Sequence, residues 1–226
     1  MAALNAEDMN RISERFTLEN VLMIKETRDM FAKHLEREWS SENLEFHREA
    51  TKLLRLVKET RALAEMPSSV TQFRAQLHMI ANTAHELEQS YIDPSSDLQV
   101  NLPTDIRKRV SWCISNVRKI SVDGIHDDDD DVSKDGAVST AVEATNTAHI
   151  NSKNGEKRIS SIHEKALDEF DAALRASEKN VFHLMKMDSF KRFRDSIEPV
   201  KRLHLVDMIE SELYDFEMDK PSFWKD

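Results

Sequence analysis

The sequence predicts an all-α fold, and three observations support this prediction. Only 3 glycines and 5 prolines occur among 226 residues, too few for the tight turns of a β-rich domain. Residues that favour helices, such as Leu, Ala, Glu, Lys, Arg and Met, are abundant. Apolar residues recur at steps of three and four, which is the spacing of one helix face. A chain of this length can bury a substantial core, and the default expectation is one domain.

Charge and composition argue against several classes of protein. A net charge of -10 argues against nonspecific binding to nucleic-acid phosphate or to an acidic bilayer. Residues 123–135 hold seven Asp and one Lys, a net -6, which leaves -4 for the remainder. The single cysteine, Cys113, excludes an intramolecular disulfide and fits a reducing compartment. Because no apolar run approaches a membrane span and no signal peptide or myristoylation glycine is present, we expect a cytoplasmic protein.

The N-terminal half predicts a series of helices behind a polar start. Residues 1–15 are polar and predict a flexible lead-in. Cap candidates, a capping box and the breaks at Met66-Pro67 and Asp93-Pro94 set the helix boundaries. The predicted helices are a short one after Thr17, one over 26–38, one from Ser40 or Ser41 to about Glu65, one from Ser69 to Asp93, and one around Ile106 to Ile120.

The C-terminal half begins with a stretch of different composition. Residues 121–158 contain all three glycines, a run of five aspartates and no Phe, Trp or Tyr, and they predict a disordered insertion. Helix resumes at a capping box from Ser161 to Glu164, Asp188 or Ser189 caps the next helix, and Pro199 begins the last. We therefore expect one domain over 16–198, interrupted by the insertion, and a C-terminal helix and tail over 199–226.

No metal or cofactor site is expected. His126-Asp127 resembles a metal dyad but lies in the predicted insertion, without a Glu-x-x-His pair elsewhere. His78 and His85 stand seven apart on one helix, a pattern more typical of solvated or core histidines. The aspartates of 127–131 lack the alternating ligands and central glycine of an EF-hand loop. Cys113 falls on an apolar stripe and is a packing residue.

Two stretches carry the strongest functional signal. Residues 38–46 read E-W-S-S-E-N-L-E-F, and 184–193 read L-M-K-M-D-S-F-K-R-F. Alone, the first predicts only a capped corner between two helices. Together they resemble the signature of the regulator of G-protein signalling (RGS) domain, E-(Y/F)-S-E-E-N-(I/L)-x-F-W followed by L-M-x-x-D-S-(Y/F)-x-R-F. Phe170-Asp171 and Val100-Asn101-Leu102 also match the family, in the right order.

The resemblance implies a bundle of about nine helices in two lobes, here with an additional C-terminal helix. It implies a GTPase activator for heterotrimeric Gα subunits that terminates signalling, and not an enzyme, because Gα holds the GTP, the Mg and the hydrolytic groups. Asn101 would reach toward the Gα glutamine, while Asp188 and Arg192 would brace a neighbouring switch segment. The Gα-binding residues that it implies are Glu38, Trp39, Ser40, Glu42, Asn43, Asn101, Leu184, Asp188, Ser189 and Arg192.

Two departures from the family pattern and one alternative remain. His47 replaces the usual Trp and is expected to affect core packing, while Ser41 replaces a Glu and is expected to affect selectivity among Gα subunits. The alternative is an RGS-fold scaffold that tethers a signalling partner without accelerating hydrolysis, for which the C-terminal helix and Trp224 could serve. Either interpretation predicts a monomer without nucleic acid or membrane span, held at the inner face of the plasma membrane, if at all, through Gα or a receptor.

Overall fold

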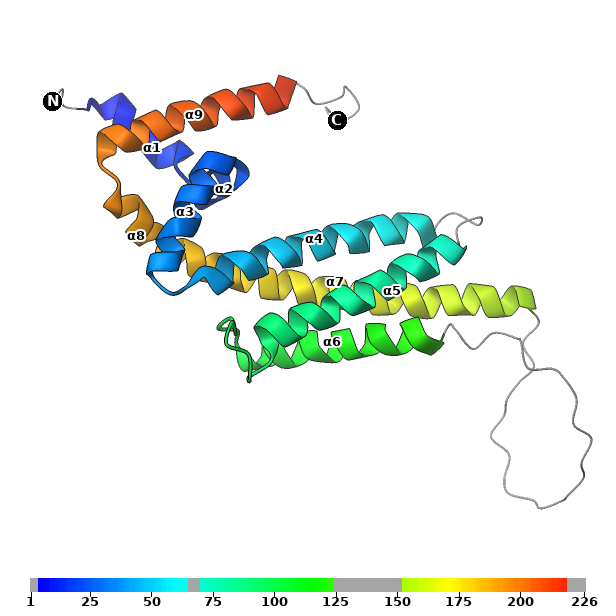
Figure 1. Ribbon diagram of the computed structural model, residues 1–226. Helices are drawn as coiled ribbons and strands as arrows, with labels where there is room; N and C mark the ends of the chain where they lie inside the picture. Colours follow the sequence, from blue (N-terminus) through cyan, green and yellow to red (C-terminus); the bar gives the residue numbers. More distant parts are fainter. Residues whose placement is uncertain (1–3, 65–69, 124–151, 219–226) are drawn as a thin grey trace, which may run out of the picture. The chain divides into compact units, whose positions relative to one another are not determined.

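The computed structural model describes residues 4–64, 70–123 and 152–218 (Figure 1). Within these ranges the chain contains helices and no strands, which confirms the all-α prediction. The helices are α1 (Ala6–Arg15), α2 (Leu18–Met23), α3 (Lys25–Arg37), α4 (Ser41–Ala64), α5 (Val70–Leu87), the π-helix η1 (Glu88–Ile92), α6 (Thr104–Asp123), α7 (Ser152–Met187), α8 (Ser189–Ser196) and α9 (Pro199–Met218).

The chain divides into two compact units, which we describe separately. The terminal unit comprises Met1–His47 and Lys179–Asp226, and the central unit comprises Arg48–Glu178. Both α4 and α7 contribute residues to each unit. The two stretches that carry the family resemblance, 38–46 and 184–193, therefore both belong to the terminal unit.

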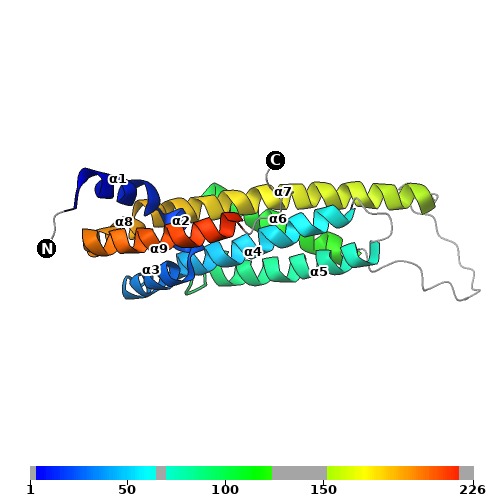
Figure 2. The ribbon, with the colours of Figure 1, turned by 90° about the horizontal axis from the view of Figure 1, so that it is seen from above.

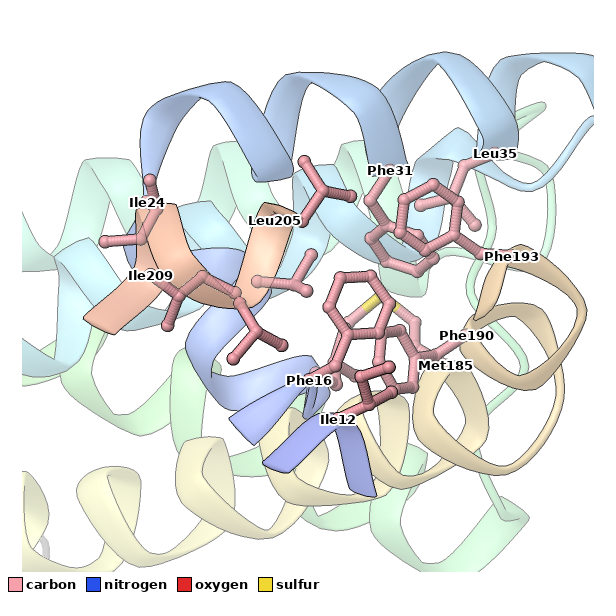
Figure 3. Packing of buried hydrophobic residues seen from close by; sticks show 13 residues of the cluster. Ile12, Phe16, Ile24, Phe31, Leu35, Met185, Phe190, Phe193, Leu205 and Ile209 are labelled. Carbon is pink, nitrogen blue, oxygen red and sulfur yellow. The ribbon is translucent and has the colours of Figure 1, made fainter. Parts of the chain in front are cut away.

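An aromatic cluster forms the core of the terminal unit (Figure 3). Phe31 is fully buried, and its ring centroid lies 5.3 Å from that of Phe193 and 6.0 Å from that of Phe190. Phe16 adds a ring 5.9 Å from Phe190. Truncation of one such buried phenylalanine to alanine costs about 3–5 kcal/mol of unfolding free energy. The cluster thus ties α3 to α8, which are distant in sequence, and holds the two motif stretches in one unit.

The N-terminal residues differ from the predicted flexible lead-in, because 6–15 form α1. A capping box begins this helix: the Asp8 backbone N–H donates to Asn5 Oδ1 at 2.8 Å, and the Asn5 N–H donates to Asp8 Oδ2 at 3.3 Å. Ile12 is buried in the core of the terminal unit. The sequence analysis missed α1 because most residues of this helix are polar and exposed, and only Ile12 is buried.

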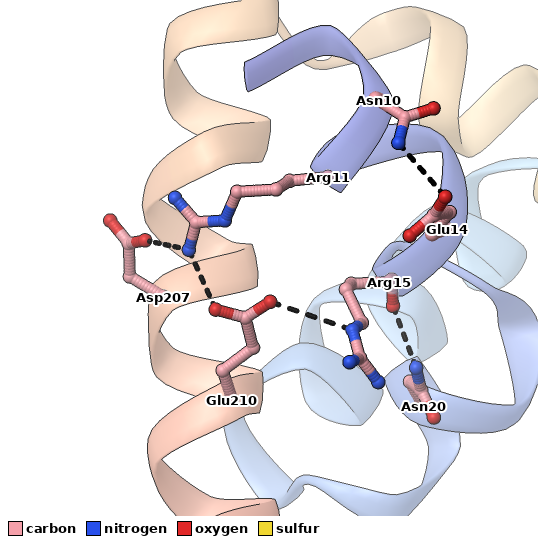
Figure 4. A network of polar contacts seen from close by, with 7 residues as sticks. All are labelled: Asn10, Arg11, Glu14, Arg15, Asn20, Asp207 and Glu210. Atoms are coloured by element: carbon pink, nitrogen blue, oxygen red, sulfur yellow. Dashed lines mark hydrogen bonds and ion pairs between the residues drawn. The ribbon is translucent and has the colours of Figure 1, made fainter. Parts of the chain in front are cut away.

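Ion pairs between α1 and α9 accompany that burial (Figure 4). Arg11 Nη2 donates to Glu210 Oε2 at 2.6 Å and to Asp207 Oδ1 at 2.9 Å. Arg15 Nε lies 3.6 Å from the other Glu210 carboxylate oxygen. Two arginines from the start of the chain therefore meet two acids of the last helix, and α9 is an integral part of the terminal unit.

In the central unit, segments of α4, α5, α6 and α7 run alongside one another (Figure 2). Polar contacts join them at several levels: Thr60 Oγ1 donates to Gln76 Oε1 at 2.8 Å, and the Arg61 guanidinium pairs with Asp168. The Cys113 thiol donates to the Glu169 carbonyl oxygen at 3.5 Å, from α6 to α7. Apolar residues on the predicted three-and-four spacing fill the interior, among them Ile80, Ala84, Val110, Val117, Leu167 and Phe170.

Helix extends into both ends of the predicted insertion over 121–158. α6 continues to Asp123 and α7 already begins at Ser152, so the capping box at Ser161 does not start a helix. Gly155 lies inside α7, where a glycine costs about 1 kcal/mol relative to alanine, a penalty that a long helix tolerates. The rest of the predicted insertion, residues 124–151, and the predicted capping serine Ser69 lie outside the described residues.

Candidate functional site

The turn between α3 and α4 has an unusual residue at its centre. The Ser40 N–H donates to the Leu35 carbonyl at 3.0 Å and the Trp39 N–H donates to the Glu36 carbonyl at 3.3 Å, which is the Schellman pattern of a helix end. Trp39 occupies the left-handed position of this motif, with a φ angle of 55°. Glycine is the usual residue there, since a side chain in this conformation costs about 1–2 kcal/mol.

The Trp39 side chain gains no burial that would offset the cost of its left-handed backbone conformation. The Trp39 side chain is 93% exposed, which makes it the most exposed of the large apolar side chains in the described part of the chain. Strained backbone that persists in a folded protein commonly lies at functional sites, where it positions a side chain for a partner. The α3–α4 turn thus presents a tryptophan to solvent from a hydrogen-bonded backbone.

A network of charged groups joins this turn to α8. Arg192 donates from Nε to Glu38 Oε1 at 2.6 Å and from Nη2 to Glu38 Oε2 at 2.9 Å. The same guanidinium also bonds to Asp188, and His34 Nε2 lies 3.2 Å from Glu38 Oε1. The hydrogen bond from Arg192 is the main cause of a lowered Glu38 pKa, and the charges of His34 and Arg192 lower it further.

These charged groups stay accessible despite their pairing. The side chain of Arg192 is 47% exposed and that of Asp188 is 70% exposed. Asp188 occupies the N-cap position of α8, but its side chain forms no capping hydrogen bond. The carboxylate bonds to Arg192 instead. Of the two predicted cap residues, Asp188 or Ser189, Asp188 therefore holds the N-cap position, but it forms no side-chain capping hydrogen bond.

The first turn of α4 adds a second carboxylate. α4 begins at Ser41, and Ser40 Oγ is buried without a hydrogen-bond partner among the described residues, so it does not cap the helix. Asn43 Nδ2 donates to Glu42 Oε1 at 2.8 Å and to the Ser40 carbonyl at 3.4 Å. Burial, and to a lesser degree the charge of Glu45, raise the Glu42 pKa. Glu42 and Asn43 are thus partly buried and locked to each other.

The end of α7 places apolar side chains at the surface of the same unit. Leu184 is 37% exposed and Met187 is 63% exposed, whereas Met185 between them is buried. Ser189 is only 6% exposed, so its hydroxyl does not contribute to the accessible surface as the resemblance implies. Sequence reasoning did not single out Met187, although its spacing of three from Leu184 places both on one helix face.

Asn101 belongs to the central unit, unlike the other nine residues that the resemblance implies. It lies in the connection between η1 and α6 and is exposed. Its neighbours are anchored, since Val100 and Leu102 are 0% and 4% exposed and the Val100 N–H donates to the Tyr91 carbonyl at 2.9 Å. Arg107 Nη2 also donates to the Leu102 carbonyl at 3.3 Å. Two buried anchors therefore hold an exposed amide.

Two further residues bear on the terminal unit. His34 was not predicted to take part, although its place four residues before Glu38 on a helix could have indicated the contact. The ring of His47, which stands where the family pattern has Trp, lies 5.4 Å from that of Phe182. This residue packs against an aromatic ring, in agreement with the expected effect on packing.

No protein-family model matches the chain, and no curated protein matches it significantly.

Among the described residues, no group of three or more His, Cys, Asp or Glu is arranged to hold a metal ion. None of the described helices combines the length and apolar character needed to cross a membrane. The fold and site describe an all-α protein with a charged and apolar surface built around Trp39, Glu38 and Arg192.

Proposed function

We propose that this protein is a GTPase activator for heterotrimeric Gα subunits. The observation that carries the proposal is the two-pronged hydrogen bond of Arg192 to Glu38, at 2.6 and 2.9 Å. It joins residues 154 positions apart that come from the two stretches resembling the RGS signature. A resemblance to the RGS signature could arise by chance in one stretch. If the two stretches form one binding surface, they must lie in direct contact, as Arg192 and Glu38 do.

The composition of the surface around this pair supports the proposal. Trp39 and Met187 offer exposed apolar area, and Asp188 and Arg192 offer accessible charges. Tight protein interfaces combine buried aromatic anchors with a polar rim, and Trp and Arg are enriched among the residues that dominate binding. Because Arg192 is already held by two carboxylates, it loses less side-chain entropy on binding than a free arginine does.

The mechanism requires no catalytic group of this chain. Gα supplies an arginine and a water-orienting glutamine, so an activator needs only to hold the mobile switch segments in their reactive arrangement. Trp39, Leu184 and Met187 would pack against one switch segment, and Arg192 with Asp188 would bond to its polar groups. Asn101, exposed between two anchored residues, would contact the segment that carries the glutamine. A terminal unit that holds its own side chains in place would lower the barrier by preorganisation.

Single-turnover GTP hydrolysis by purified Gα subunits, with and without the full chain, tests the proposal. We expect the rate to rise at least about tenfold, which corresponds to about 1.4 kcal/mol of transition-state stabilisation. We also expect tighter binding to Gα carrying GDP with aluminium fluoride than to Gα carrying GDP alone, since an activator prefers the transition state. Equal binding to both forms without acceleration would indicate the tethering scaffold. Neither binding nor acceleration with any Gα class would refute both interpretations.

A further inference from the structure

One face of α6 brings basic and apolar side chains together at the surface of the central unit. Every position along it at alternating steps of four and three is exposed: Lys108, Trp112, Ser115, Lys119 and Val122. The opposite face of the helix carries the buried residues Val110, Cys113 and Val117. The five exposed residues, together with the exposed neighbour Arg109, are called the α6 face below.

The α6 face is positively charged within an acidic chain. Over α6, Thr104–Asp123, the sequence has five basic residues and two acidic residues, a net +3, whereas the whole chain has -10. Lys108, Arg109 and Lys119 form no ion pair with any residue of the described ranges, while nearby Arg118 contacts His85 Nδ1 at 3.3 Å. Three of the cations therefore point into solvent uncompensated.

The α6 face also exposes apolar area. Trp112 is 57% exposed and Val122 is 55% exposed. Tryptophan is enriched where one end of a side chain is apolar and the other is wet, as in the headgroup region of a bilayer. The basic stripe of α4, made of Arg48, Lys52, Arg55 and Lys58, is different. It has no exposed large apolar side chain within the described residues, and Glu49 pairs with both Arg48 and Lys52.

We propose that the α6 face binds the surface of an anionic lipid bilayer. Trp112 would insert at headgroup level, and Lys108, Arg109 and Lys119 would contact the acidic headgroups around it. The net charge of the chain, which argues against nonspecific binding, is screened beyond about 8–10 Å at physiological salt, so this contact depends on the local charge of α6. The local field of a few cations decides adsorption to a flat anionic surface.

Lysine at both ends of the stripe favours a bilayer over a protein partner. Protein interfaces are enriched in Arg and depleted in Lys, whereas long lysine side chains extend readily to lipid headgroups while their stems cover apolar surface. Lys108 and Lys119 lie one turn before and two turns after Trp112 on the same exposed face. A single row of this kind fits a plane better than a concave partner. The inference does not depend on the proposed activity toward Gα.

Co-sedimentation of the full chain with phosphatidylcholine vesicles, with and without phosphatidylserine, tests this surface. We expect binding that needs phosphatidylserine and that weakens as salt is added. Each basic side chain at an anionic surface contributes about fivefold in partition, so Lys108→Glu with Lys119→Glu should reduce binding by more than tenfold. Arg55→Glu with Lys58→Glu on α4 changes the net charge equally and should retain most of the binding. Equal loss in both double variants would refute a dedicated α6 face.

Tryptophan fluorescence tests the insertion of Trp112 directly. The chain has three tryptophans, so Trp39→Phe with Trp224→Phe leaves Trp112 as the only one. Its emission should shift to the blue on phosphatidylserine vesicles, and brominated lipid should quench it. Unchanged emission on vesicles that bind the chain would overturn the placement of Trp112. Failure to bind vesicles, with capture by a polyglutamate peptide instead, would assign the face to an acidic protein and refute the proposal.

Discussion

Arg192 and Glu38 form a two-pronged hydrogen bond between α8 and the end of α3, with donor–acceptor distances of 2.6 and 2.9 Å. Because this bond lowers the Glu38 pKa, it contributes stability that is fully present above the unfolded glutamate pKa of about 4.3. That contribution is lost as pH falls through the lower pKa of the folded state.

Glu38→Gln should therefore be destabilising at neutral pH and nearly neutral in strong acid. Urea unfolding of the parent and the variant between about pH 7 and pH 3 measures this, and the difference between their unfolding free energies should shrink as pH falls. Glu36→Gln, which changes an exposed carboxylate on the same helix, is the matched control and should have a small effect on the unfolding free energy. A difference that stays constant with pH would contradict the assigned role of the ion pair.

Trp39 should show opposite effects on stability and on partner binding. Trp39→Gly relieves a left-handed residue with φ 55° and should raise the unfolding free energy by about 1 kcal/mol. Trp39→Ala removes the same side chain but keeps the strained conformation, so its stability should change little. Both variants should weaken Gα binding to a similar degree. Thermal unfolding and a binding titration on the two samples separate strain from contact, and a stable Trp39→Gly variant with full binding would exclude Trp39 from the interface.

Asn101 should matter for activation but not for folding. The side chain of Asn101 is exposed and has no core packing to lose, so Asn101→Ala should change the unfolding free energy by less than about 0.5 kcal/mol. Activated hydrolysis should slow by more than about tenfold if the amide holds the Gα switch. Single-turnover hydrolysis and thermal unfolding on one sample decide this. Full activity would remove Asn101 from the site, and global unfolding would assign it a structural role.

Ile12 should be needed for the stability of the terminal unit, in contrast to the expected flexible lead-in. It is 4% exposed and packs in the aromatic cluster, so Ile12→Ala should cost about 2–4 kcal/mol of unfolding free energy. Met9 on the same helix is 48% exposed, and Met9→Ala should have a small effect. Chemical denaturation of both variants compares them, and an Ile12→Ala effect as small as that of Met9→Ala would mean that α1 adds little to folding.

Local periodicity predicted the long helices because each buries a continuous apolar stripe. α6 is an example: Val110, Cys113 and Val117 were predicted to face the core and all are buried. α1 was missed although its Asn5–Asp8 capping box is a local signal, because one buried apolar residue, Ile12, leaves no repeating stripe. Its ion pairs with two acids of α9, about two hundred positions away in sequence, leave no local pattern.

The candidate site was predictable in composition but not in geometry. The motifs named Glu38, Asp188 and Arg192, and the spacing of four between Asp188 and Arg192 is that of a pair on one helix face. Nothing in the sequence indicated that Arg192 would also bond to Glu38. The left-handed conformation of Trp39 was equally hidden, since the sequence places a residue there that disfavours it. Burial of Ser189 follows from the packing of Phe190 and Phe193, which a motif cannot report.

The labelling rate of the Cys113 thiol reports on motion in the central unit. Cys113 is the only cysteine of the chain, and it is 2% exposed. Burial raises the pKa of its thiol, so the reactive thiolate is disfavoured and shielded from reagents while α6 and α7 are packed together. Any modification must await separation of α6 from α7, whose Glu169 carbonyl accepts its hydrogen bond. The labelling rate of the unaltered protein therefore measures how often these two helices part. An added surface cysteine would react far sooner, so a dye could be attached there while Cys113 remains in place.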